Sequence, residues 1–184
     1  MSAASRLRGA AVAERLLASD PQAAASLDWE TLGRAPAWLA LPDAEFDTLQ
    51  CRVGAVLCGR ALRLWIDRGR LAAAQAALGA PFLRTLLAEP DAASIPIGLV
   101  TCPEIDSPAQ VEPMLRLAGA SVLLASLPDG VLREVVGAAL APVTASTMAP
   151  ELAVTLVVRA EALASPAADP PPAAREAALA GAAA

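Results

Sequence analysis

The sequence has no histidine, lysine or tyrosine, so every basic residue is an arginine. Without histidine there is no imidazole to act as a general base, to activate a serine or cysteine, or to bind zinc. Without lysine there is neither a Schiff-base amine nor the lysine of a phosphate-binding loop. A GC-rich bacterial genome would explain the missing lysine and tyrosine. Whatever its cause, the composition excludes most common enzyme mechanisms and leaves carboxylate pairs, a lone cysteine or a bound cofactor.

Aromatic residues are also scarce, at 3% of the chain, although hydrophobic residues reach 56%. Much of the hydrophobic content is alanine, which favours helix but contributes little buried area per residue. We therefore expect an all-α fold, mostly helical, whose helices pack closely through small side chains. Leucine and valine should supply the large core residues, together with Phe46, Phe82, Trp29, Trp38 and Trp65.

The spacing of apolar residues predicts a series of helices separated by glycine and proline. We expect a compact helical domain over residues 1–164, to which residues 1–27 could belong as a loosely attached N-terminal helix. Residues 165–184 form an Ala/Pro-rich segment that we expect to be a disordered tail. Residues 90–108 contain four prolines and should form a packed loop. The predicted helices cover residues 3–19, 43–67, 70–78, 82–87, 108–127, 129–140 and 151–163, with short helical pieces near residues 21 and 29. Residues 154–158 are rich in β-branched side chains, so a strand is the alternative there.

Charge and hydropathy narrow the classes of partner. The net charge of −5 opposes nonspecific nucleic-acid binding and docking on an anionic bilayer. The longest low-polarity runs, residues 95–102 and 117–127, are shorter than the ~20 residues that span a bilayer. Arginines and glutamate interrupt the first residues, which argues against a signal peptide. We expect a cytoplasmic protein without direct membrane insertion.

Three cysteines and several carboxylates are the remaining candidates for chemistry. Cys51 and Cys58 lie seven residues apart on the predicted helix 43–67, but two thiolates without histidine make a poor zinc set. The odd cysteine count favours three free thiols. The carboxylates at 43, 45 and 47 are explained by the positive end of a helix dipole, and those at 104 and 106 by a solvated loop. We therefore expect no catalytic residues, no metal site and no cofactor.

One basic cluster stands out in this acidic chain. Arginine near a helix C-terminus favours the dipole, and Arg63 could pair with Asp67 one turn on. Arginine is also enriched at protein interfaces, where its guanidinium binds carboxylates with two parallel hydrogen bonds. The candidate partner-binding residues are Arg60, Arg63, Trp65, Asp67, Arg68 and Arg70.

The same stretch carries a family resemblance. The chain reads W-L-A-L-P at residues 38–42 and G-R-A-L-R-L-W-I at 59–66, followed by Leu71 and Leu78-Gly79. A second stretch, residues 117–140, has a small-residue helix with Leu127-Pro128 and then Leu132-Arg133. Together these features resemble the SctK family of bacterial type III secretion, which includes the YscK, PscK, OrgA and MxiK proteins.

The resemblance implies a cytoplasmic adaptor of the secretion sorting platform. Such an adaptor would bridge the inner-membrane ring protein to the pod protein that carries the ATPase assembly, and it would be an α-helical protein without cofactor. The chain lacks the longer, more charged C-terminal part of many members. A type III secretion chaperone, or another helical regulatory binding protein, is the alternative; it would use an exposed apolar groove and usually dimerise. A carboxylate enzyme with a cofactor is a third reading.

Overall fold

A computed structural model describes residues 3–19, 21–89, 103–140 and 148–165. Over these ranges the chain is all-α, as predicted, and contains no strand. The elements are α1 (Ala3–Ser19), α2 (Pro21–Ala24), α3 (Trp29–Arg34), the 3-10 turn η1 (Ala37–Ala40), α4 (Asp43–Leu57), α5 (Gly59–Arg63), α6 (Arg68–Leu78), α7 (Ala80–Ala88), the 3-10 turn η3 (Pro108–Gln110), α8 (Val111–Ala125), α9 (Val131–Ala139) and α10 (Pro150–Ala164).

Local signals in the sequence explain where several helices begin. Pro21, Pro81 and Pro150 each lie in the first turn of a helix, where the missing N–H costs no hydrogen bond. Asp28 caps α3, because its carboxylate accepts a hydrogen bond of 2.6 Å from the backbone N–H of Thr31. This bond holds the pKa of Asp28 below its usual value. These starts agree with the sequence-based prediction.

The centre of the fold is the pair α4 and α8, which cross at two glycines. A Cβ added to Gly54 would lie 2.0 Å from the carbonyl oxygen of Leu115, and one added to Gly119 would lie 1.8 Å from that of Gln50. No larger residue fits at either position while the two backbones stay this close. The predicted close packing through small residues is confirmed here.

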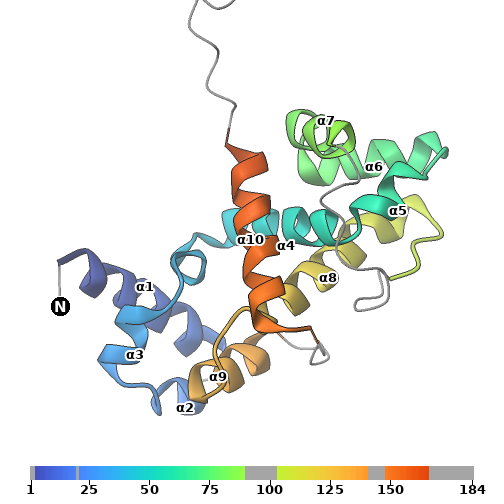
Figure 1. The fold of residues 1–184 in the computed structure, drawn as a ribbon. Helices are drawn as coiled ribbons and strands as arrows, with labels where there is room; N and C mark the ends of the chain where they lie inside the picture. The colour runs from blue at the N-terminus through green and yellow to red at the C-terminus, as the bar shows by residue number, and fades with distance from the viewer. Residues whose placement is uncertain (1–2, 20, 90–102, 141–147, 166–184) are drawn as a thin grey trace, which may run out of the picture.

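The remaining helices surround this pair (Figure 1). At one end α1 packs against α3, η1 and α9, and it contributes Val12 and Leu16 to the buried core. At the other end lie α5, α6 and α7. The orange helix α10 packs on both α4 and α8, and its Arg159 Nε donates to Glu89 just after α7, over 3.1 Å. One continuous hydrophobic core therefore joins elements from both ends.

Three sequence-based expectations are corrected. The single helix predicted over residues 43–67 is wrong: α4 ends at Leu57, Cys58 turns the chain, and α5 ends at Arg63. Trp29 is 61% exposed and is not a core residue, whereas Trp38 is buried. Cys58 is disulfide-bonded and is not a free thiol.

Other expectations have mixed outcomes. Residues 154–158 are helical, within α10, so the strand alternative is wrong. Residues 103–107 have no helix or strand, as predicted for that part of the loop. The remainder of the predicted packed loop, residues 90–102, lies outside the described residues, as do Cys102 and nearly all of the predicted tail, residues 166–184.

Candidate protein-binding surface

The predicted basic cluster surrounds a short connector, Leu64–Asp67, between α5 and α6. After the last turn of α5 the backbone becomes extended at Asp67, with φ −74° and ψ 115°. Leu64 is 73% exposed and Ile66 is 94% exposed, whereas Trp65 between them is half-buried against the core. The connector thus anchors its aromatic residue and presents its two aliphatic residues to solvent.

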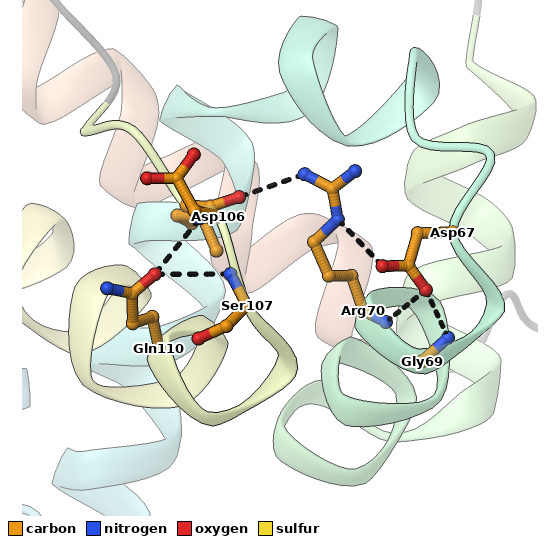
Figure 2. Close-up of polar contacts among 7 residues, drawn as sticks. Asp67, Gly69, Arg70, Asp106, Ser107 and Gln110 are labelled. Atoms are coloured by element: carbon orange, nitrogen blue, oxygen red, sulfur yellow. Dashed lines mark hydrogen bonds and ion pairs between the residues drawn. The ribbon is translucent and has the colours of Figure 1, made fainter.

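Asp67 fixes the end of the connector by capping α6. Its Oδ1 accepts a hydrogen bond of 2.7 Å from the N–H of Gly69 and a longer one of 3.4 Å from that of Arg70 (Figure 2). These amides have no partner within the helix, so the carboxylate satisfies them. Oδ2 of Asp67 also pairs with Nε of Arg70 at 3.4 Å. The predicted pair of Arg63 with Asp67 is therefore replaced by a cap and a pair with Arg70.

Arg70 ties the connector to the segment that leads into α8. Its Nη1 donates to the carbonyl oxygen of Ile105 over 2.9 Å, and its guanidinium lies 5.2 Å from the ring centroid of Trp65. Ile105 is buried. A guanidinium over an indole face is an attractive cation–π arrangement. Arg70 therefore holds the indole and the neighbouring segment together.

That neighbouring segment is itself held by Gln110. The Oε1 of Gln110 accepts from the backbone N–H groups of Asp106 and Ser107, over 3.0 and 3.2 Å (Figure 2). Pro108 also lies close to Gly69, because a Cβ at that glycine would come within 3.0 Å of Pro108 Cγ. The start of α6 is thus braced against a structured turn.

The six candidate residues divide into two groups. Trp65, Asp67 and Arg70 brace the connector, and Arg63 donates from Nη2 to the carbonyl oxygen of Leu86 over 3.1 Å, which ties α5 to α7. Arg60 and Arg68 are exposed, and neither side chain has a hydrogen bond or ion pair within the described residues. The sequence-based site therefore mixes residues that build the surface with residues that present charge.

Leu64 and Ile66, the two most accessible apolar residues of this surface, were not predicted from the sequence to belong to it. Leu64 lies within residues 43–67, for which a single helix was predicted, and leucine was expected to supply core residues. The signal that could have revealed it is Asp67, a residue type that favours helix starts, placed directly before Arg68-Gly69-Arg70. An N-cap at Asp67 requires that the preceding helix has already ended.

Several other hydrophobic side chains are exposed, and one of them, Leu7, likewise lies between two exposed arginines, Arg6 and Arg8. Trp29 and Leu7, at 61% and 74% exposed, lie in α3 and α1. Val154 and Val158, at 46% and 57%, lie one turn apart on α10. Around α3 the exposed charges are of both signs, since Glu30 pairs with Arg34.

Two of the carboxylates considered for catalysis, those of Asp43 and Asp47, form ion pairs with arginines of other helices. Asp43 pairs with Arg15 of α1 at 3.0 Å, and Asp47 pairs with Arg116 of α8 at 3.5 Å. Asp43 and Glu45 lie in the first turn of α4, as the dipole argument predicts. Among the described residues no group of three or more His, Cys, Asp or Glu side chains could hold a metal ion.

The buried Cys51 has little nucleophilic character. Burial raises the pKa of its thiol above the usual 9.0, although Arg116 acts in the opposite direction. A thiol is a nucleophile only as the thiolate, so a raised pKa lowers its reactivity near neutral pH.

No single helix in the described ranges is long and apolar enough to cross a bilayer. The helices α6 and α7 meet the length and composition criteria only when they are taken together, and the pair bends by 116° at the break between them.

Scans of this chain against models of protein families, curated proteins and solved structures find no match.

Proposed function

We propose that this protein is a non-enzymatic adaptor of a type III secretion sorting platform, which bridges the inner-membrane ring to the pod and ATPase assembly through protein–protein contacts. The observation that carries the proposal is the connector. It presents Leu64 and Ile66, at 73% and 94% exposed, between the exposed arginines Arg60 and Arg68. Aliphatic and arginine side chains on one small surface suit recognition of another protein.

The family resemblance supports the same reading at the same residues. One of the runs that resemble the SctK family, residues 59–66, forms α5 and most of the connector. Arg60 lies in α5, and Leu64 directly follows the last residue of that helix. The resemblance thus falls on a surface feature as well as on core positions such as Trp38.

The proposed location is the cytoplasmic face of the inner membrane, reached through protein partners. This location depends on the resemblance. Three free thiols would have indicated a reducing compartment, but Cys58 is disulfide-bonded. The absence of histidine and lysine supports a function in binding over one in catalysis.

The test is affinity capture of the tagged protein from its own bacterium, with the recovered proteins identified by mass spectrometry. The proposal predicts recovery of the inner-membrane ring and pod proteins. Recovery of one small secreted protein, together with a dimeric mass of the purified chain in light scattering, would replace the adaptor with a secretion chaperone. Recovery of neither kind of protein would refute a role in secretion.

A further inference from the structure

We infer that the connector patch, defined as Arg60, Leu64, Ile66 and Arg68, binds an acidic segment of its partner in which aliphatic side chains lie among carboxylates. This inference rests on the proposed binding function and names the chemistry of the partner. It follows from the exposure, the rigidity and the charge of the patch.

Exposure makes the apolar part of the patch available. Ile66 is the most exposed large hydrophobic residue in the described part of the chain, and Leu64 is nearly as exposed as Leu7. The patch is small, so two aliphatic contacts alone would bind weakly. A partner needs matching aliphatic residues and a second kind of attraction.

Rigidity lowers the cost of binding. Asp67 caps α6, Arg70 bridges to Ile105, and Trp65 packs on the core directly between the two exposed residues. The backbone of the connector is therefore already ordered before a partner arrives. Preorganisation of this kind raises affinity because less conformational freedom is lost on association.

Charge selects the partner. Residues 59–70 contain four arginines and a single carboxylate, whereas the whole chain has a net charge of −5. The carboxylate is Asp67, which already accepts from the amides of α6 and pairs with Arg70. Arg60 and Arg68 keep exposed guanidinium groups, which bind carboxylates with two parallel hydrogen bonds.

Other polyanions fit this surface less well. Anionic membranes are bound by clusters of about 4–8 basic residues, whereas this patch exposes two beside two aliphatic residues. Nucleic-acid binding depends on neutralising many phosphates, which the acidic remainder of the chain opposes. An acidic protein segment with aliphatic residues can contact both the arginines and the aliphatic side chains of the patch.

The test places a benzophenone side chain in the patch and identifies what it reaches. The full-length variant Ile66→p-benzoylphenylalanine is produced in the source bacterium and irradiated, and the crosslinked peptide is sequenced by mass spectrometry. The matched control is Val158→p-benzoylphenylalanine on α10, where the native side chain is 57% exposed. We expect a protein crosslink from position 66 alone, to a segment rich in Asp and Glu with aliphatic residues between them.

Three results would overturn the inference: a lipid crosslink, a crosslink to a neutral or basic segment, or no more crosslinking at position 66 than at position 158. Charge provides a second readout in the same background. Arg60→Glu with Arg68→Glu should reduce the crosslink about tenfold or more, whereas Arg6→Glu with Arg8→Glu, exposed on α1, should leave it unchanged. Equal crosslink yields from the two double variants would show that the patch does not recognise carboxylates of the partner.

The inference and the proposed function can fail separately. An acidic segment from a protein outside the secretion apparatus would sustain the inference and refute the adaptor. Capture of ring and pod proteins without a crosslink from position 66 would sustain the adaptor and place its contact elsewhere.

Discussion

At the scale of single residues, the fold depends most on Gly54 and Gly119, where the backbones of α4 and α8 touch. A β-carbon at Gly119 would lie 1.8 Å from a backbone carbonyl oxygen, which cannot move aside as the end of a side chain can. The only relief is to separate the two helices and loosen the core between them.

Gly119→Ala should therefore destabilise the protein by at least about 2 kcal/mol, at the upper part of the range for overpacked cores. Urea unfolding followed by circular dichroism measures the change. The matched control is Gly137→Ala in α9, where the added carbon meets only the side chain of Leu124, at 3.5 Å. This control should be neutral or stabilising by up to about 1 kcal/mol, because alanine favours helix over glycine. Equal stability of the two variants would mean that α4 and α8 do not cross at this glycine.

Cys51 offers a residue-scale test of the interior. Its burial predicts that iodoacetamide at pH 8 modifies it only after unfolding, and peptide mass spectrometry can follow that position. Because the pKa is raised in the folded state, the contribution of this thiol to stability is complete below about pH 9 and is lost as the pH rises further. In Cys51→Ala this part of the alkaline loss should disappear. Rapid modification of the native protein would contradict the burial.

At the scale of elements, the starts of helices were easier to predict from the sequence than their ends. Asp28 and Pro150 mark the starts of α3 and α10 through local chemistry, which sequence reasoning can read. The break at Cys58 has no comparable signal, because apolar periodicity continues past it to Leu64. After the break α5 packs against α7, and the sequence alone does not display such tertiary packing.

The start of α6 can be tested through its cap. Asp67→Ala should destabilise the protein by about 1 kcal/mol, because it leaves the amides of Gly69 and Arg70 without their acceptor. Asp67→Asn retains an acceptor oxygen and should lose less. Thermal unfolding by circular dichroism compares the two. If both variants match the original protein, the connector is not held by this cap.

At the scale of the whole molecule, the all-α class and the position of the basic cluster followed from the sequence, but the surface itself did not. Arg60 and Arg68 were identified by composition, whereas the exposure of Leu64 and Ile66 depends on where α5 ends. The sequence also grouped Arg63 and Arg70 with the binding residues, although both make hydrogen bonds that join elements of the fold. Charge reversal at these two positions would therefore perturb the fold as well as the surface.

The most direct measurement of the central claim is the amount of partner that two matched variants capture. Leu64→Ser with Ile66→Ser removes the aliphatic residues of the connector patch, and Val154→Ser with Val158→Ser removes an exposed pair on α10. Because burial of one such side chain is worth about 1.5–3 kcal/mol, the first variant should lose capture about tenfold or more, while its helical circular dichroism is unchanged. The second variant should capture as much as the original protein. Undiminished capture by the first variant, or an equal loss in both, would contradict binding through the connector.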